Sequence, residues 1–178
     1  AAGLERWRPG DKVQVLLDGE DEVRTYTPFG WGEEGGMALL AFVHGESPAS
    51  RWAERVAPGQ RLRFVGPQGS LAMPDDAITI VGDETSLAVA ADYTPSRPGR
   101  VRAFLEVDER TAIDGVLGDI GLGSATLVRR AEGAARGRAL LDVLADVSGA
   151  VALTGGGERI QNVRASLRAR GVRDIKSK

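Results

Sequence analysis

Short runs of alternating apolar and polar residues, separated by turn signals, make up the first part of the chain. Lys12–Leu17 begins with strict alternation directly after Pro9-Gly10-Asp11, and residues 61–65 alternate after Pro58-Gly59. Alternation with a period of two is typical of strands with one buried face, and Pro-Gly pairs are typical of turns. We therefore expect a small antiparallel barrel with strands at residues 12–17, 23–27, 37–44 and 61–65 and one short helix at 50–56.

From about residue 77 the pattern changes to apolar runs that alternate with helical spacing. The last stretch places Ile160, Val163 and Leu167 on one face of a helix. Strands that alternate with helices imply a parallel α/β sheet. We expect strands at 77–81, 101–107, 125–128 and 150–154, and helices at 86–93, 111–117, 138–146 and 158–170. The turn Met73-Pro74-Asp75-Asp76 separates the two patterns, which predicts two domains, residues 1–73 and 74–178.

Composition excludes several classes of protein. The 178 residues are 42% hydrophobic and 27% charged, with a formal net charge of −2. No apolar run reaches the roughly 18 residues that a membrane-spanning helix needs, so we expect no membrane insertion. The basic runs are short and offset by acids, so we expect no nucleic-acid binding. The chain has no cysteine, which excludes disulfides, iron–sulfur clusters and thiolate sites.

The single histidine, His44, is the one candidate for a histidine-based metal site or a Ser-His-Asp hydrolase. No partner cluster accompanies it, so we predict neither a metal centre nor proton transfer by this side chain. If the protein is an enzyme, a bound cofactor supplies the difficult chemistry. The chain start lacks the apolar stretch of a secretory signal, so we expect a cytoplasmic protein, and we expect a monomer.

The segment Arg24-Thr25-Tyr26-Thr27 combines residue types that can hold a flavin. In an extended strand, Arg24 and Tyr26 lie on one face, and Thr25 and Thr27 lie on the other. Arginine offers a fork of donors to a phosphate, and tyrosine offers a flat ring that stacks on a heterocycle. Thr27 offers a hydroxyl and an amide to a ring nitrogen. Taken alone, however, the four residues fit an edge strand with a surface Arg–Tyr pair better.

A strand, a turn and a helix start follow one another between residues 42 and 52. Ser50 stands where it can cap the short helix. Amides at such a helix start, with Ser50 and Arg51 as further donors, can cradle a phosphate. A plain strand–turn–helix with a serine cap is an equally good interpretation. Trp52 is expected to pack in the core rather than to contact a cofactor.

Two glycine-containing turns lie at strand ends in the second half. Gly82-Asp83-Glu84-Thr85-Ser86 is neither a dinucleotide fingerprint nor a phosphate loop. Its two acids would repel phosphate, so Thr85, Ser86 and helix-start amides would have to hold a nucleotide; an N-cap is the alternative. Gly155-Gly156-Gly157-Glu158 ends the last predicted strand, where glycines allow close approach of a nicotinamide ring or simply form a tight turn.

In this order, the segments together resemble the siderophore-interacting protein family of flavin-dependent ferric reductases. The resemblance rests on Arg24-Thr25-Tyr26-Thr27, on His44-Gly45-x-x-Pro48-Ala49-Ser50-Arg51-Trp52-Ala53, on Pro58-Gly59 with Val65-Gly66-Pro67, on Gly82-Asp83-Glu84-Thr85 and on Gly157-Glu158. It covers nearly the whole chain. It implies FAD on a six-stranded antiparallel barrel, followed by a parallel-sheet α/β domain for NADH or NADPH. Because little precedes the first clear strand, we expect the barrel to lack one or two opening strands.

The resemblance also implies roles for individual residues. Arg24, Thr25, Tyr26 and Thr27 look like the flavin-binding motif. Tyr26 would stack on the isoalloxazine ring and Thr27 would lie near its N5 atom, so these two are the predicted catalytic residues. The other predicted cofactor-binding residues form a ribityl and pyrophosphate segment, His44, Gly45, Ser50 and Arg51, and a nicotinamide nucleotide site, Asp83, Glu84, Thr85, Gly156, Gly157 and Glu158.

The function that the resemblance implies is reduction of a ferric siderophore by NAD(P)H through FAD, with release of Fe(II). Siderophore complexes are often anionic, so a basic surface near the flavin would attract them. Lys176 and Lys178 are candidates for this role, although lysines at a chain end are usually solvated. Two alternatives remain open: a flavin or electron-transfer reductase with another acceptor, and a non-catalytic module that binds flavin or siderophore. The sequence does not distinguish NADH from NADPH.

Overall fold

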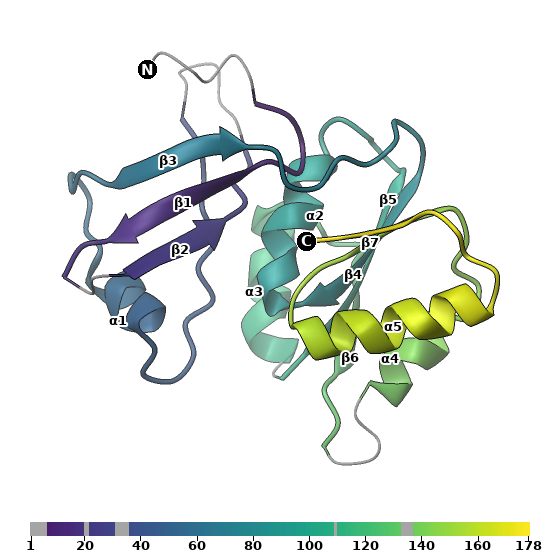
Figure 1. Cartoon of the computed structure of the whole chain (residues 1–178). Helices are drawn as coiled ribbons and strands as arrows, with labels where there is room; N and C mark the ends of the chain where they lie inside the picture. The colour runs from purple at the N-terminus through teal and green to yellow at the C-terminus, as the bar shows by residue number, and fades with distance from the viewer. Residues whose placement is uncertain (1–6, 20–21, 31–35, 109, 133–136) are drawn as a thin grey trace.

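The computed structural model describes residues 7–19, 22–30, 36–108, 110–132 and 137–178, and of residues 110–112 it describes the backbone alone. Within these ranges the chain forms an antiparallel sheet of three strands and a parallel sheet of five (Figure 1). The antiparallel sheet belongs to the first part of the chain and the parallel sheet to the second. The predicted fold class, a β part followed by an α/β part, is therefore confirmed.

The antiparallel sheet has the strand order β2-β1-β3, so β1 lies at its centre. Its strands are β1 (Lys12–Leu17), β2 (Glu22–Tyr26) and β3 (Arg63–Gln68). Alternation in β1 places Val13, Val15 and Leu17 on one face, where none is more than 1% exposed. These residues pack against Trp52 of the helix α1 (Pro48–Arg55). Trp52 is therefore a core residue, as predicted.

The described residues form fewer strands than the six-stranded barrel that we expected. Residues 37–44, expected as a strand, contribute one isolated bridge, between Phe29 and Ala38. Leu39 and Leu40 in this stretch pack against two different apolar clusters. An apolar run indicates burial and does not by itself indicate strand pairing. Here the run is only partly buried, with Val43 46% exposed, and two of its leucines pack against different clusters instead of the run pairing along its length.

The parallel sheet has the strand order β6-β5-β4-β7-β8, and every neighbouring pair in it is parallel. Its strands are β4 (Ile78–Asp83), β5 (Val101–Val107), β6 (Thr126–Arg129), β7 (Ala150–Leu153) and β8 (Ile175–Ser177). The helices are η2 (Glu84–Ser86), α2 (Leu87–Tyr93), α3 (Arg110–Asp119), α4 (Arg138–Val143) and α5 (Gly157–Ala169). All predicted strands and helices of this half are present, with small shifts at their ends. The strand β8 was not predicted.

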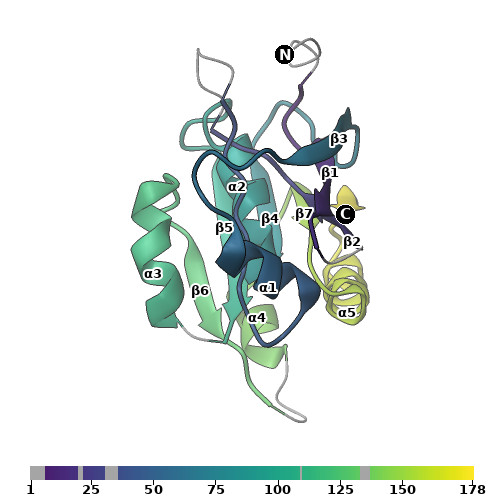
Figure 2. The same cartoon turned by 90° about the vertical axis from the view of Figure 1, so that its left-hand side faces the viewer.

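Helices cover both faces of the parallel sheet (Figures 1 and 2). One apolar cluster joins α2 and α3 to one face and includes Leu105 and Leu117. A second cluster joins α4 and α5 to the opposite face and includes Phe104 and Leu167. Burial on both faces explains why all six residues of β4 are buried. Among the described residues, no helix combines the length and apolar character needed to cross a membrane.

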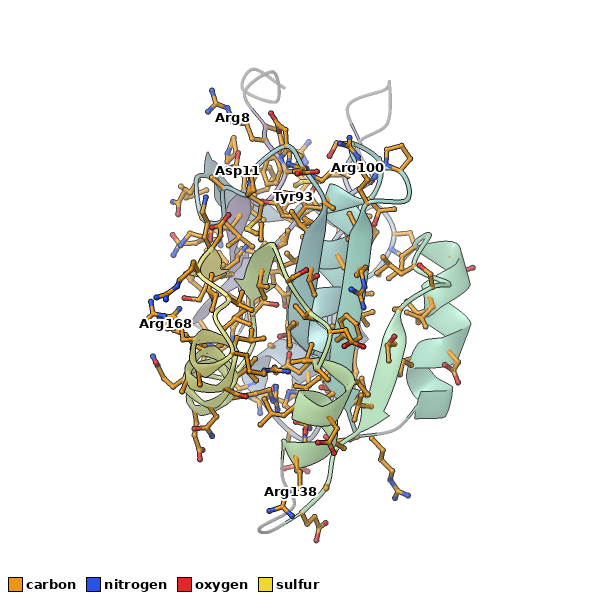
Figure 3. The ribbon with its side chains drawn as sticks, turned by 90° about the vertical axis from the view of Figure 1, so that its right-hand side faces the viewer. Arg8, Asp11, Tyr93, Arg100, Arg138 and Arg168 are labelled. Atoms are coloured by element: carbon orange, nitrogen blue, oxygen red, sulfur yellow. The ribbon has the colours of Figure 1, made fainter. Side chains whose placement is uncertain are left out.

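The strand order of the parallel sheet reverses between β4 and β7. The chain passes from β4 outward through β5 to β6, and then returns to the other side of β4 to add β7 and β8. Doubly wound sheets bind ligands at the carboxyl ends of the strands where the order reverses. In Figure 3, Arg138 lies at the end of the molecule where the strands have their carboxyl ends, and Arg100, directly before β5, lies at the opposite end.

The two sheets meet along a seam formed by the turn before β1, the segment after β3, and α2. Gly10 lies there with φ +89°, and a Cβ on it would stand 1.9 Å from the carbonyl oxygen of Leu71. The Leu71 amide donates to the Gly10 carbonyl at 3.1 Å, and the Tyr93 hydroxyl donates to the Leu71 carbonyl. The Gly10 amide donates to Asp92 Oδ2 at 2.7 Å. The turn thus joins the antiparallel sheet to α2, and Figure 3 shows Asp11 close to Tyr93 at this place.

Candidate functional site

The predicted flavin motif lies in β2, an edge strand of the antiparallel sheet, and in the residue after it. Arg24 and Tyr26 stand opposite Val15 and Val13 of β1, so the four side chains share the inner face of the sheet. The half-buried ring of Tyr26 lies 6.1 Å, centroid to centroid, from that of Trp52. Burial raises the pKa of the Tyr26 hydroxyl, and the charge of Arg24 opposes the rise. Arg24 and Tyr26 thus share one face, as alternation predicts.

The members of this motif differ in accessibility. The Arg24 side chain is 44% exposed, and its guanidinium lies 2.5 Å from the Glu22 carboxylate. Thr25 is exposed, whereas Thr27 is buried. The hydroxyl of Thr27 accepts a hydrogen bond from the Lys178 ammonium at 2.6 Å. The motif therefore presents an accessible guanidinium and a half-buried ring, while its last hydroxyl contacts the C-terminal part of the chain.

Serine hydroxyls close the turn before α1. Ser47 caps this helix, not Ser50 as we predicted, because Pro48 begins the helix and the Ser47 Oγ accepts from the Ser50 amide at 3.2 Å. Ser50 is 1% exposed. Its hydroxyl donates to the His44 carbonyl at 2.8 Å, and its oxygen accepts from the His44 amide at 3.0 Å. The Ser50 hydroxyl therefore holds the turn together and is not open to a phosphate.

The other predicted residues of this turn lie at the surface. His44 and Gly45 are exposed, and the His44 ring stacks on Phe42 at a centroid distance of 5.0 Å. Arg51 is also exposed, and its guanidinium donates to the Glu46 carbonyl at 2.5 Å. Because α1 packs against the inner face of the antiparallel sheet, this turn and the flavin motif belong to the same part of the molecule.

The turn at residues 82–86 forms an N-cap for η2, which is one of the two interpretations that the sequence allowed; the other was a nucleotide site. The Asp83 carboxylate accepts from the Thr85 amide at 3.0 Å, and the Asp83 amide donates to Ser86 Oγ at 3.1 Å. The Thr85 hydroxyl donates to the same carboxylate at 2.5 Å. Asp83 and Glu84 are buried, and Thr85 is exposed. Of these three predicted nucleotide-site residues, Thr85 is thus the accessible one.

Two arginines and four carboxylates form a cluster at the carboxyl ends of β4, β5 and β6. This strand-end cluster consists of Asp83, Glu84, Glu106, Asp108, Arg130 and Arg159. Arg159, in α5, lies 2.5 Å from Asp83 and 3.0 Å from Glu106. It therefore joins the start of α5 to the ends of β4 and β5.

Arg130, directly after β6, connects the remaining members of the strand-end cluster. Its guanidinium lies 2.8 Å from Glu84 and also binds Asp108, and the Asp108 amide donates to Glu84 at 2.7 Å. Burial lowers the pKa of Arg130, but the carboxylates of Glu84, Asp108 and Glu106 outweigh burial, so the net shift is upward. Since the side chains of Glu84 and Glu106 are at most 4% exposed, Arg130 compensates charges that water hardly reaches.

A cleft of about 510 Å³ opens beside the strand-end cluster, at the start of α5. Gly156, Gly157 and Glu158 line it, together with Arg159 and Asn162. A Cβ on Gly156 or Gly157 would meet no other part of the described chain within 4 Å, so packing does not require glycine at these positions. The volume is in the range of small-molecule sites, and the glycines allow a ligand to approach the backbone.

The ends of β7 and β4 approach each other closely, which brings the two predicted glycine turns together. Gly155 has φ +102°, and a Cβ on it would stand 2.5 Å from Asp83 Oδ2. The hydroxyl of Thr154 is buried and has no hydrogen-bond partner among the described residues. A buried hydroxyl without a partner, at the point where the strand order reverses, is a place where a ligand atom can bind.

Lys178 joins the flavin motif to this edge of the parallel sheet. Its amide donates to the carbonyl of Leu153, the last residue of β7, at 3.1 Å, and its ammonium donates to Thr27. In Figure 1 the yellow C-terminal strand runs toward the antiparallel sheet. Burial lowers the pKa of Lys178 to about 8, and the carboxylate of Asp92 opposes this shift. Lys178 is therefore not the solvated lysine that is usual near a chain end.

Sequence reasoning did not assign site roles to Arg130 or Arg159. It named Glu106 only as the start of a region, 106–110, that could distinguish NADH from NADPH, and it named Lys178 as a residue that attracts an anionic siderophore. Glu106 carried a signal, since it is the one carboxylate in the apolar strand Val101–Val107. Arg159 directly follows a predicted site residue. Arg130 and Lys178 carried no local signal, because their partners Glu84 and Thr27 lie 46 and 151 positions away.

The N-terminal part of the chain matches a known family. Residues 6–71 fit the family model of the siderophore-interacting FAD-binding domain. An NADPH-dependent ferric-chelate reductase from Escherichia coli (strain K12) is 40% identical over 53 residues. This match covers 30% of the chain and 21% of that reductase, so the chain matches about a fifth of the length of this curated relative.

Solved structures share the whole fold. A siderophore utilization protein from T. fusca superposes with a TM-score of 0.73 at 21% identity, over 99% of this chain and 82% of that one. The siderophore-interacting protein SipS from Aeromonas hydrophila superposes with a TM-score of 0.71 at 20% identity, over 98% of this chain and 79% of that one. These similarities establish the fold.

Proposed function

We propose that the chain belongs, through residues 6–71, to the siderophore-interacting FAD-binding domain family and that it is an NAD(P)H-dependent flavin oxidoreductase that reduces a ferric siderophore. FAD binds the first domain, residues 1–73, and the nicotinamide nucleotide binds the second, residues 74–178. FAD, when bound, would supply the electron transfer between NAD(P)H and the iron. The protein acts as a monomer in the cytoplasm, where NAD(P)H is available.

The chemistry of the β2 residues fits FAD. The accessible guanidinium of Arg24 suits a phosphate, and the half-buried ring of Tyr26 can stack on the flavin. Thr27, the next residue, adds a hydroxyl that accepts from Lys178. Since the Ser50 hydroxyl is engaged within its turn, the exposed backbone at Gly45 and the exposed guanidinium of Arg51, which also donates to the Glu46 carbonyl, would face the pyrophosphate.

The cleft at the start of α5 fits the nicotinamide nucleotide. Gly156 and Gly157 leave space against the backbone, and Glu158 and Asn162 can accept hydrogen bonds from ribose hydroxyls. The partnerless hydroxyl of Thr154 offers one more polar contact at the strand end. Asp83 and Glu84 shape this edge from inside the protein and do not contact the nucleotide.

One observation carries the proposal: Lys178 binds Thr27 with its side chain and Leu153 with its amide. The flavin motif therefore adjoins the carboxyl end of β7, where the nucleotide is expected. Transfer of electrons between two cofactors requires their reacting rings to be in contact, and orientation by the protein is its main contribution. This arrangement supports two cofactor sites that adjoin each other.

A ferric siderophore is the acceptor in this proposal, because the matched family is named for siderophore interaction and the matched relative for ferric-chelate reduction. Fe(II) is less charged and softer than Fe(III), so oxygen-rich chelators hold it more weakly. One-electron reduction of the bound iron therefore releases it from the chelator.

An anaerobic titration tests this function. The protein is loaded with FAD, titrated with NADH or NADPH, and then mixed with a ferric siderophore in the presence of a colorimetric Fe(II) chelator. We expect the nucleotide to bleach the flavin absorbance, and the siderophore to restore it while the Fe(II) complex forms. A protein that cannot be loaded with FAD contradicts the proposal. Bleaching without reoxidation by the siderophore would indicate a different electron acceptor.

Arg24→Ala tests the flavin motif. We expect FAD to bind about ten- to a hundredfold more weakly, since a charge-assisted hydrogen bond contributes about 1.5–3 kcal/mol. Fluorescence quenching of added FAD measures the affinity. Arg63→Ala is the matched control, because Arg63 lies in β3 of the same sheet and pairs with Asp18 as Arg24 pairs with Glu22. Equal FAD affinities of the two variants would reject the motif assignment.

A further inference from the structure

Lys178 is fixed by both its backbone and its side chain. Its amide bond to the Leu153 carbonyl, at 3.1 Å, continues the pairing of β8 with β7. Its ammonium donates to Thr27 Oγ1 at 2.6 Å. An ammonium has donors and no acceptor, so the Thr27 oxygen must be the acceptor and the Thr27 hydrogen is free to point elsewhere. Thr27 is 6% exposed, so this contact lies where water competes little.

Asp92 supplies the counter-charge to Lys178. It lies in α2, is 6% exposed, and accepts from the Gly10 amide at 2.7 Å. Burial raises the pKa of Asp92 to about 6, and the Gly10 amide and the charge of Lys178 oppose the rise. Lys12 and Asp11 are the other charged groups that act on Lys178. Since the two pKa values lie on either side of neutrality, both groups are mainly charged at neutral pH.

We propose that Lys178 is a positioning residue of the flavin site, which fixes the Thr27 hydroxyl and makes the bound flavin easier to reduce. This inference rests on the proposed function, because it requires FAD at the β2 motif. Thr27 is the residue of that motif predicted to lie at the reacting part of the ring. The contact with Lys178 holds the Thr27 oxygen as an acceptor, so that its hydrogen points away from the ammonium, and it places a positive charge 2.6 Å from that oxygen.

The effect on the flavin is electrostatic. Reduction adds negative charge to the ring system, and a nearby protein charge changes the cost of that addition. A cation in a partly buried place acts more strongly than one in water, because the surrounding medium screens it less. Lys178, directly after β8, is partly buried, whereas Lys176 within β8 is exposed. Asp92 has the opposite sign and weakens the effect of Lys178.

The test compares midpoint potentials of FAD-loaded variants, measured against a reference dye at neutral pH. Lys178→Met keeps the length and apolar stem but removes the charge, and we expect a more negative potential. Lys178→Arg retains a cation and should keep the potential close to that of the unaltered protein. Asp92→Asn removes the counter-charge and should shift the potential in the positive direction. Lys176→Met should cause no shift, because Lys176 donates to the Ala72 carbonyl and not to Thr27.

A purely structural role would lower the thermal stability of Lys178→Met without moving its potential. A potential unchanged by Lys178→Met, in a protein that still binds FAD, overturns this inference and leaves the proposed function intact. An unaltered protein that binds no FAD overturns both. Should Lys178→Met fail to fold, Asp92→Asn decides: a potential equal to that of the unaltered protein overturns the inference, and a positive shift supports it.

Discussion

Gly155 and Gly157 lie two positions apart and have different reasons to be glycine. Gly155 has a left-handed backbone, and a Cβ on it would stand 2.5 Å from the Asp83 carboxylate. Gly157 is the first residue of α5, has no positive φ, and has open space where a Cβ would stand. Packing therefore requires the first glycine, whereas in the proposed function the second one makes room for a nucleotide.

We expect Gly155→Ala to lower the free energy of unfolding by about 1–3 kcal/mol, because the strained backbone and the contact with Asp83 both oppose a side chain. Gly157→Ala should leave it unchanged or raise it by up to about 1 kcal/mol, since alanine favours a helix. The same change should weaken nucleotide binding. Urea unfolding measures the stabilities, and titration with NAD(P)H measures the binding. Equal losses of stability would contradict the distinction.

At the scale of elements, Arg130 connects the carboxyl ends of β4, β5 and β6. It binds Glu84, directly after β4, and Asp108, directly after β5, and it follows β6 itself. Parallel strands whose ends carry several carboxylates repel one another there unless a cation compensates the charge. Arg130 thus holds the carboxyl ends of β4, β5 and β6 together beside the cleft.

Arg130→Met should lower the free energy of unfolding by about 3–5 kcal/mol, because it leaves the buried carboxylate of Glu84 without a cation and leaves Glu106 with Arg159 alone. Adding Glu84→Gln to this variant should restore part of the loss, since one uncompensated charge is then removed. Arg129→Met is the control: Arg129 is the exposed last residue of β6, and its replacement should change stability by less than about 0.5 kcal/mol. Urea unfolding of the variants gives these differences, and similar values for Arg129→Met and Arg130→Met would refute the role of the cluster.

At the scale of the whole molecule, the seam between the two sheets contains a buried carboxylate. Asp92 accepts from Gly10 of the N-terminal turn and faces Lys178 and Asp11. Its pKa is raised from 3.8 to about 6 in the folded protein, mainly by burial. The folded protein therefore binds this proton more tightly than the unfolded chain does, and the resulting stability is present below about pH 4 and lost as the pH rises through about 6.

Between about pH 4 and 7 we expect the unaltered protein to lose up to about 3 kcal/mol of stability relative to Asp92→Asn, which has no proton to lose. Urea unfolding of both proteins at several pH values measures the difference. Asp114→Asn, on the exposed side of α3, serves as the control. The difference in its free energy of unfolding from the unaltered protein should not change with pH in this way. A difference between the unaltered protein and Asp92→Asn that stays constant with pH would count against a buried, proton-binding Asp92.

The sequence predicted the site in part, and the reasons differ between residues. The strand that carries Arg24 and Tyr26 follows from its β-forming residues, their shared face follows from alternation, and the core role of Trp52 follows from helical spacing. The prediction that Ser50 caps the helix α1 was wrong. The helix begins at Pro48, so Ser47 is the residue that caps it. Which donors stay free for a ligand depends on such local contacts, and composition does not reveal them.

By itself the sequence determined the order of the two architectures and the types of side chain available for chemistry. Periodicity reports which face of one element is buried, and that is a local property of the chain. Only the tertiary structure decided that Lys178 contacts Thr27, that Arg130 and Arg159 compensate the carboxylates at the strand ends, and that Gly155 must fit against Asp83. These partners lie far apart along the chain, and only the packing of the two sheets brings them within reach of one another.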